Sequence, residues 1–357
     1  MTLAEILQLR LEQQFIARPF TGSAPELASH LCAMQAQDYA AGKWAMGVRL
    51  PGFTDAMADA AFADRSIIRT YSLRSTFHIV HPADARWLTA LARERFISTT
   101  ASMHRKLELD EKTFAKCNTI IHDALSGGRE LTREELKALL EKKKINCEPQ
   151  RMNNILYRAG MDEVICSGKR RGKEFTYALL DDYAPATKKL PPEEALSLLA
   201  RRYIAGHGPA TAQDLAWWSG YPVTACKAAL LSHGKALHTE TVQEQEYWLL
   251  PGTAPGKAAT GMKLLSGFDE YYMGFKDKRP MLDEAFSQHM SPPNGLLPYI
   301  ILLNGKIAGT WRRDIKKNVI GMEYTPFKPF SAAQLKALKE AGKAFSTFME
   351  LPLEWAG

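Results

Sequence analysis

The chain has 357 residues, of which 46% are hydrophobic and 24% are charged, and its formal net charge is +7 at pH 7. These values are typical of a folded globular protein large enough for two or three domains, and they exclude an intrinsically disordered chain. No run approaches the roughly 20 apolar residues that cross a bilayer, and the basic balance favours a polyanionic partner.

The cysteines exclude two further classes, because none of them has the C-x-x-C spacing of a zinc site or the even number of a disulfide framework. The N-terminus has no apolar signal-peptide core. We therefore expect a cytoplasmic protein with free thiols and without a metal or another cofactor. The five cysteines are Cys32, Cys117, Cys147, Cys166 and Cys226.

The first elements in the chain are helical. Apolar residues at helical spacing predict a helix over residues 2–17, and Ser23 with Glu26 forms a capping box for a second helix. That second helix runs into the segment Met34-Gln-Ala-Gln-Asp-Tyr39. A third helix is expected over residues 55–63.

Two glutamines in this segment are candidate site residues. Side chains two residues apart on a helix point about 200° apart, whereas in an extended chain they share a face. Gln35 and Gln37 can therefore act together only if the helix ends near Met34. The alternative is a pair of surface glutamines.

Residues 69–80 alternate between apolar and polar side chains, which predicts a strand. Its polar face would present Arg74, Thr76 and His78 in a row. Arg74 could bind a phosphate and His78 could hydrogen-bond in a site, although a structural histidine is the alternative.

A winged-helix order follows. Thr132 and Glu135 form a capping box, a second helix is expected over residues 150–160, and residues 162–180 read as strand, turn and strand. Between Lys142 and Leu180 there are nine basic and four acidic residues, a net charge of +5. A cationic turn beside a polar helix is what phosphate positioning requires, so we expect DNA contacts here. The expected contact residues are Lys169, Arg170, Arg171 and Lys173 in the turn and Gln150, Arg151 and Asn154 on the helix.

A solvated hairpin tip, or a winged helix that binds protein, is the alternative for that basic segment. The same order of elements recurs further along, and residues 251–261 read as a linker. Strands are then expected over residues 268–275, 297–303 and 307–312, with Asn304-Gly305 as a type I′ turn, and a helix over residues 331–350 closes the chain.

The predicted fold is therefore α+β and mainly helical, with a β-rich element at the C-terminus. Four regions are expected: an N-terminal winged-helix-like region with the two glutamines (residues 1–129), a second winged helix with the basic hairpin (130–185), a third winged helix (190–251), and a C-terminal β-rich, barrel-like element with its closing helix (262–357).

The chemistry open to two glutamines is limited. Their amide oxygens can hold a water, but they cannot take its proton strongly. This suits a leaving group that already carries positive charge, such as an N7-alkylated guanine on its N-glycosidic bond, with carbonyl dipoles stabilising an oxocarbenium-like sugar. Asp38 is a competing base, but in an extended chain it faces away from both glutamines, so a cap or an ion pair is its expected role. The sequence has no H-E-x-x-H, Walker or G-x-S-x-G motif.

Several blocks of the sequence resemble the AlkZ-like bacterial DNA glycosylases, winged-helix enzymes that excise N7-alkylguanine and unhook interstrand crosslinks. The resemblance spans nearly the whole chain and keeps the order of the blocks. The blocks are Met34-Gln-Ala-Gln-Asp-Tyr39 with Gly42-Lys-Trp-Ala45, Leu73-Arg-Ser-Thr-Phe-His78, Gly208-Pro-Ala-Thr-Ala-Gln-Asp-Leu-Ala-Trp-Trp-Ser-Gly220 and Phe268-Asp-Glu-Tyr-Tyr-Met-Gly274.

The resemblance implies three tandem winged-helix motifs, a C-terminal β-rich element around a basic concave surface, and a catalytic Gln-aliphatic-Gln motif at Gln35-Ala36-Gln37. One branch of the family has Asp in place of the second glutamine. This chain keeps Gln37, which places it nearer the branch associated with self-resistance to alkylating antibiotics.

Two main hypotheses follow. The first is a monofunctional DNA glycosylase that acts on N7-alkylated purines in double-stranded DNA, including bulky adducts or interstrand crosslinks, with Asp38, Arg74, Thr76 and His78 as possible support around the two glutamines. We expect it to be monomeric, to need no protein partner, and to associate with the nucleoid when bound to DNA. The second is a non-enzymatic winged-helix DNA-binding protein or transcriptional regulator, and a protein-interaction module is a weaker third.

Overall fold

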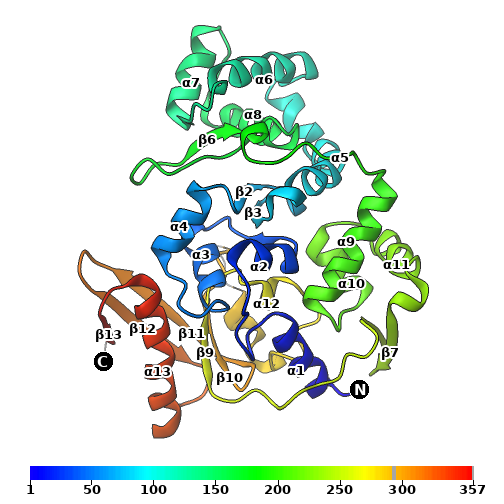
Figure 1. Cartoon of the computed structure of the whole chain (residues 1–357), viewed down its shortest axis with the longest axis vertical. Coiled ribbons are helices and arrows are strands. Elements are labelled where there is room, and N and C mark those ends of the chain that lie inside the picture. The colour runs from blue at the N-terminus through cyan, green and yellow to red at the C-terminus, as the bar shows by residue number, and fades with distance from the viewer. Residues whose placement is uncertain (292–294, 356–357) are drawn as a thin grey trace. The chain divides into compact units, whose positions relative to one another are not determined.

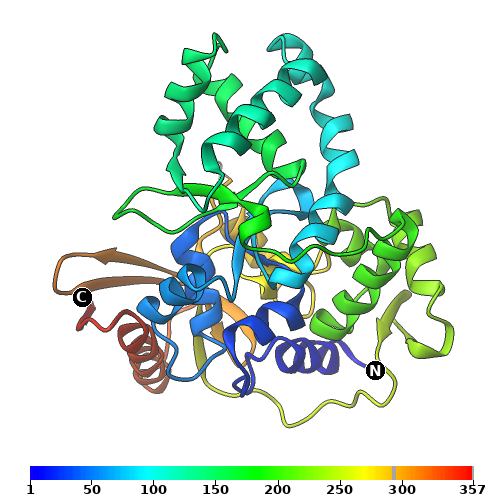
Figure 2. The same cartoon turned by 45° about the horizontal axis from the view of Figure 1, so that its top comes forward.

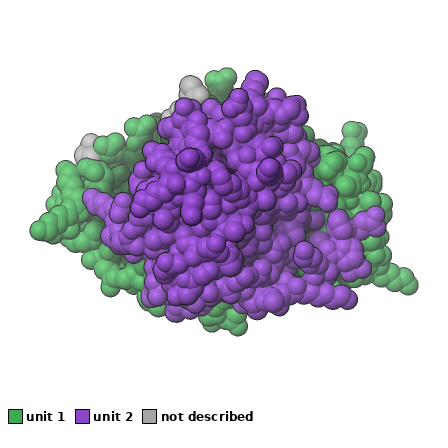
Figure 3. Space-filling model, turned by 90° about the horizontal axis from the view of Figure 1, so that it is seen from above, with its two compact units in different colours: residues 1–59, 196–357 green, residues 60–195 purple. Residues whose placement is uncertain are grey.

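The computed structural model describes residues 1–291 and 295–355. The chain forms two compact units, which Figure 3 colours separately. Unit 1 combines Met1–Asp59 with Leu196–Gly357, and unit 2 is Ala60–Ala195. The four regions expected from the sequence follow element order instead, and the first of them is divided between the two units.

Unit 1 brings the N-terminal helices together with the C-terminal half of the chain (Figure 1). Its elements are α1 (Leu3–Gln13), α2 (Ala24–Leu31), β1 (Met34–Gln35), α3 (Tyr39–Gly47), the start of α4 (Asp55–Ala63), most of α9 (Pro192–His207), α10 (Ala212–Ser219), α11 (Val223–Leu231), β7 (His238–Val242), β8 (Gln245–Leu249), β9 (Met262–Leu265), α12 (Glu270–Met273), β10 (Tyr299–Leu303), β11 (Lys306–Ile315), β12 (Ile320–Pro326), α13 (Ala332–Met349) and β13 (Leu353–Trp355).

A curled five-stranded sheet in the order β13-β12-β11-β10-β9 forms the C-terminal β-rich element, so this prediction is confirmed. β9 to β12 are antiparallel neighbours, and β13 pairs with β12 in parallel. β10 turns into β11 through Asn304 (φ 51°) and Gly305 (φ 84°), the positive values that a type I′ turn requires. Figures 1 and 2 both show α13 beside this sheet, where Trp44, Trp311 and Phe345 share one core.

The expected strand over residues 268–275 is wrong. The segment is the short helix α12, because the Asp269 carboxylate accepts a hydrogen bond from the Tyr271 amide and caps it. Asp269 is itself held by Arg49, with Nη2–Oδ1 at 2.7 Å and Nη1–Oδ2 at 2.9 Å. This ion pair is fully buried and ties the chain after α3 to the start of α12.

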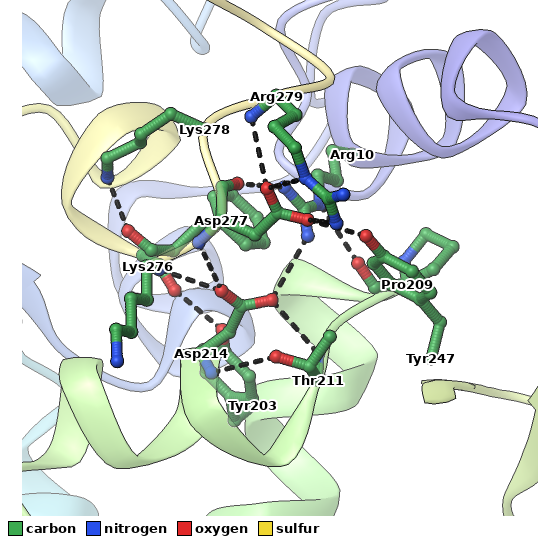
Figure 4. A network of polar contacts seen from close by, with 12 residues as sticks. Arg10, Tyr203, Pro209, Thr211, Asp214, Tyr247, Lys276, Asp277, Lys278 and Arg279 are labelled. Atoms are coloured by element: carbon green, nitrogen blue, oxygen red, sulfur yellow. Dashed lines mark hydrogen bonds and ion pairs between the residues drawn. The ribbon is translucent and has the colours of Figure 1, made fainter. Parts of the chain in front are cut away.

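A second buried carboxylate, Asp214 on α10, joins three distant segments of unit 1 (Figure 4). Its Oδ2 accepts hydrogen bonds from Arg10 Nη2 at 3.2 Å and from the Thr211 amide at 3.0 Å. Its Oδ1 accepts from the amides of Lys276 and Asp277 at 2.7 and 2.8 Å. Thr211 is also the N-cap of α10.

Unit 2 contains helices and two small sheets. Its elements are the end of α4, β2 (Ile68–Tyr71), a 3₁₀ turn (Leu73–Ser75), β3 (Phe77–Val80), α5 (Pro82–Lys106), α6 (Glu111–Leu125), β4 (Leu131–Thr132), α7 (Arg133–Lys142), α8 (Pro149–Met161), β5 (Ile165–Ser167) and β6 (Thr176–Leu179).

Helices α6, α7 and α8 enclose one core that includes Phe114, Leu136 and Leu156. Beside them, β4, β6 and β5 form a three-stranded sheet in that order. The capping box of Thr132 and Glu135 starts α7 as predicted. The basic hairpin connects β5 and β6 of this sheet, so the helical core supports the hairpin.

The single strand expected over residues 69–80 is wrong. Two antiparallel strands, β2 and β3, pair from Ile68 with Val80 to Tyr71 with Phe77. Arg74 (φ 53°) and Ser75 (φ 57°) form the turn between them, and these positive values break the alternation that the sequence suggests. Both strands are buried. The β-branched and aromatic residues therefore predicted the strand conformation correctly, but not that the segment forms two strands.

None of the five cysteines forms a disulfide, and all of them are buried. Over residues 1–291 and 295–355, no helix combines the length and the apolar character that a bilayer-crossing segment needs. Within the same part of the chain, no three His, Cys, Asp or Glu side chains lie close enough together to hold a metal ion.

Candidate active site

The helix before the two glutamines ends near Met34, which is the condition for Gln35 and Gln37 to act together. Helix α2 ends at Leu31, and Cys32 has a φ of 66°, which turns the chain out of the helix. Met34 and Gln35 are extended as β1, and helix α3 starts only at Tyr39. Gln35 and Gln37 therefore both lie in non-helical backbone, Gln35 in β1 and Gln37 in the bend that precedes α3.

The two glutamine side chains differ in burial. Gln35 is only 9% exposed, and its Oε1 is a buried acceptor that has no hydrogen-bond partner among the residues the structure describes. Gln37 is exposed. The segment therefore holds one buried amide carbonyl and one amide that meets solvent.

Asp38 acts as the N-cap of α3. Its Oδ1 accepts a hydrogen bond from the Ala41 amide at 3.1 Å, and its backbone is extended. This confirms the expected capping role. Asp38 also lies near Tyr299 of β10, where burial raises the pKa of the phenol to about 12 and the Asp38 charge adds to that effect.

A buried carboxylate that the sequence did not single out lies under Gln35. The main-chain N–H of Gln35 donates to Glu270 Oε1 at 2.7 Å, and Trp218 Nε1 donates to Glu270 Oε2 at 2.7 Å. His207 Nε2 is 3.5 Å from the same Oε2. Glu270 is 1% exposed, and it is the first residue of α12. Its position in the block Phe268-Asp-Glu-Tyr-Tyr-Met-Gly274 was the available signal.

Arg74, Thr76 and His78 belong to unit 2. Arg74 lies in the turn between β2 and β3, Thr76 follows that turn, and His78 is fully buried in β3. His78 Nδ1 lies 3.0 Å from both Ser72 Oγ and the Thr76 carbonyl oxygen. The three side chains are therefore not a row on one strand face, and His78 takes part in the structure of the hairpin.

The basic hairpin between β5 and β6 is exposed from Lys169 to Phe175. Arg170 lies over the Phe175 ring at 4.8 Å and donates to the Lys173 carbonyl at 2.6 Å. Arg171 pairs with Glu135 at 2.8 Å, and both groups of that pair are about half exposed. Lys169, Arg170 and Lys173 are the other cations of this turn, and all three are exposed.

The neighbouring helix α8 divides its polar residues between two roles. Gln150 is exposed, and Asn154 donates to the Gln150 carbonyl at 2.8 Å. Arg151 instead donates to the carbonyls of Leu107 and Asn146, which ties α8 to the chain before it. Sequence reasoning treated Arg151 as a surface cation because spacing does not reveal such backbone acceptors.

One further cation of the basic segment is structural. Arg158 is buried and holds Glu111 and Asp162, with Nε–Oδ2 at 2.9 Å to Asp162. The hydrogen bond to Glu111, helped by the one to Asp162, outweighs the opposing effect of burial and raises the pKa of the Arg158 guanidinium. The positive surface is therefore narrower than the charge count of the sequence indicates.

Comparison with known proteins decides the family. The family model described as "DNA glycosylase AlkZ-like" matches residues 28–348, nearly the whole chain. The chain belongs to the AlkZ-like DNA glycosylases. This assignment makes it a glycosylase with a DNA substrate, and it favours the first hypothesis over a regulator or a protein-interaction module.

A known protein and a solved structure, both from Streptomyces sahachiroi, agree with the assignment. This AlkZ-like chain is 24% identical over 357 aligned residues to an interstrand DNA cross-link repair glycosylase, covering 94% of this chain and 93% of that protein. The solved structure of the DNA glycosylase AlkZ has a TM-score of 0.83 and 22% identity, with 100% of both chains covered. The AlkZ-like fold therefore extends over the whole chain.

Proposed function

We propose that this AlkZ-like chain is a monofunctional DNA glycosylase that hydrolyses the N-glycosidic bond of N7-alkylated purines. Bulky adducts and interstrand crosslinks are included among its substrates, in line with the name of its Streptomyces relative. Gln35 and Gln37 position the attacking water.

One observation carries the proposal. Gln35 Oε1 is a buried amide oxygen that no described residue of the chain satisfies, and it lies in an extended segment two residues from Gln37. An unsatisfied buried acceptor is unfavourable by about 1–3 kcal/mol, so its retention indicates a partner from outside the chain, such as a substrate water.

The reaction needs little from the protein in the way of proton transfer. N7-alkylation gives the base a positive charge, so the C1′–N9 bond breaks with its electron pair going to the base, which leaves neutral. The sugar then carries the positive charge, and amide carbonyl dipoles can stabilise it. The water held by these oxygens attacks C1′ and releases its proton to solvent, and an abasic sugar remains.

The order of elements supports three winged-helix motifs for DNA binding. Helix, short strand, two helices and two strands occur in that order as α2-β1-α3-α4-β2-β3 and again as α6-β4-α7-α8-β5-β6. The third series, α9-α10-α11-β7-β8, has an isolated bridge from Ala210 to Trp248 in place of the short strand. In the second series α8 would lie against a groove and the basic hairpin against phosphates.

The test is incubation of the full-length protein with duplex DNA that carries one 7-methylguanine, followed by measurement of the free base and of strand integrity. We expect release of 7-methylguanine and an intact strand that breaks only after alkali. Absence of free base would refute the N7-alkylpurine substrate, and strand breakage without alkali would refute the monofunctional mechanism.

A further inference from the structure

We propose that Glu270 is a positioning residue of the glycosylase reaction: its buried carboxylate holds the Gln35 main chain in the extended conformation that lets Gln35 and Gln37 act on one water. This inference rests on the proposed role of the two glutamines and deepens it.

β1 does not keep its conformation on its own. It consists of only two residues, and it lies between the sharp turn at Cys32 and the start of α3. So short a segment keeps one conformation only through partners from elsewhere. Within unit 1, the hydrogen bond from the Gln35 N–H to Glu270 Oε1, at 2.7 Å, is such a partner. A bond to a charged acceptor is stronger than one to a neutral carbonyl.

Glu270 is itself rigidly held. Trp218 Nε1 donates to Oε2 at 2.7 Å, and Trp218 is fully buried in contact with Tyr203 and His207. On the main-chain side, Asp269 caps α12, whose first residue is Glu270. Arg49, which follows α3, donates to the Asp269 carboxylate. The end of α3 is therefore linked to the residue next to Glu270, whose carboxylate holds β1.

A carboxylate is required at position 270. Both oxygens face N–H donors, Gln35 on one side and Trp218 on the other. A glutamine at this position could accept only one of these hydrogen bonds, because its NH₂ group would oppose the other donor. Burying a charged carboxylate is unfavourable. Its presence at position 270 is explained by the two N–H donors, which only a carboxylate can satisfy together.

The experiment compares full-length wild type with Glu270→Gln in single-turnover release of 7-methylguanine, with DNA affinity and melting temperature measured in parallel. A displacement near 1 Å in a reacting group lowers rates by roughly 100-fold. We therefore expect the Glu270→Gln rate to fall by about 10- to 100-fold while DNA affinity changes less than about twofold. A rate within about twofold of wild type would overturn the inference.

Asp214→Asn is the matched control, because Asp214 is an equally buried carboxylate of unit 1 that accepts from Arg10 and from backbone amides of other segments. It should lower the melting temperature without lowering the rate per folded molecule. An equal loss of rate in both variants would reduce Glu270 to a structural role. The double variant Glu270→Gln/Trp218→Phe removes the opposed donor and should recover part of the lost rate, and no recovery would contradict the two-donor argument.

A second measurement does not depend on activity or on the folding of a variant. In the amide NMR spectrum of the wild-type protein, the Gln35 proton should lie far downfield, as expected for a short bond to a carboxylate, and it should move upfield in Glu270→Gln. An ordinary wild-type shift would overturn the contact. If Gln35→Ala and Gln37→Ala both keep the wild-type rate, the proposed function fails, and the Gln35 resonance still decides the role of Glu270.

Discussion

Replacement of Asp214 by Asn is the substitution whose effect on stability follows most directly from the structure. The carboxylate accepts from two donors at each oxygen: Arg10 and the Thr211 amide at Oδ2, and the amides of Lys276 and Asp277 at Oδ1. Whichever way the asparagine amide is turned, its NH₂ group opposes two N–H donors. The substitution also removes the counter-charge of Arg10, which is 0% exposed.

Breaking a buried ion pair by removing one partner destabilises a protein by about 3–5 kcal/mol. For a unit of this size, 1 kcal/mol corresponds to roughly 2–4 °C, so the melting temperature should fall by about 6–20 °C. Differential scanning calorimetry of the full-length protein measures it. Asp283→Asn is the control, since Asp283 pairs with Lys306 at a similar 3.0 Å but both side chains are 53% exposed. A fall no larger for Asp214→Asn than for Asp283→Asn would refute the reasoning.

Three further predictions concern pH, packing and DNA affinity. Burial opposes ionisation of Asp277, but hydrogen bonds from Arg279 and Tyr247 outweigh it and lower the pKa to about 2, below the ordinary 3.8. This stabilisation, roughly 2 kcal/mol, is present above pH 3.8 and lost as the pH falls towards 2. The difference in unfolding free energy between wild type and Asp277→Asn, measured by urea titration, should therefore shrink over that pH range and not widen. A Cβ at Gly160 would lie 2.2 Å from the buried Tyr71 ring, so Gly160→Ala should destabilise by about 1–3 kcal/mol in urea unfolding, and an unchanged midpoint would contradict that packing. Arg170→Ala should weaken DNA binding about equally for all sequences and reduce the salt slope of log K by roughly 1, whereas an unchanged slope would remove the arginine from the phosphate contacts.

Local signals in the sequence predicted much of the fold. The capping boxes at Ser23 and Thr132 start helices as expected, because a cap depends on residues only three apart. The Asn304-Gly305 turn was equally local. The hairpin of β2 and β3 was missed because its turn uses positive φ at Arg74 and Ser75, without the glycine or asparagine that usually marks such a turn.

The candidate site depended on both local and distant information. The sequence could state that Gln35 and Gln37 need extended backbone, since that follows from helix geometry. It could not show that Glu270, 235 residues away, accepts the Gln35 N–H, because long-range contacts leave no trace in spacing. The same limit applies to Arg151, whose backbone acceptors are invisible in a charge count.

The most direct test of the central claim is the single-turnover rate of 7-methylguanine release by wild type, Gln37→Ala and Asp38→Asn. Asn is as good a helix cap as Asp, so Asp38→Asn preserves α3 while removing the one carboxylate of the segment. We predict a loss of about 100-fold for Gln37→Ala, the scale of a mispositioned reactant, and a near-normal rate for Asp38→Asn. A near-normal rate for Gln37→Ala together with a large loss for Asp38→Asn would contradict this prediction and assign the chemistry to the acid.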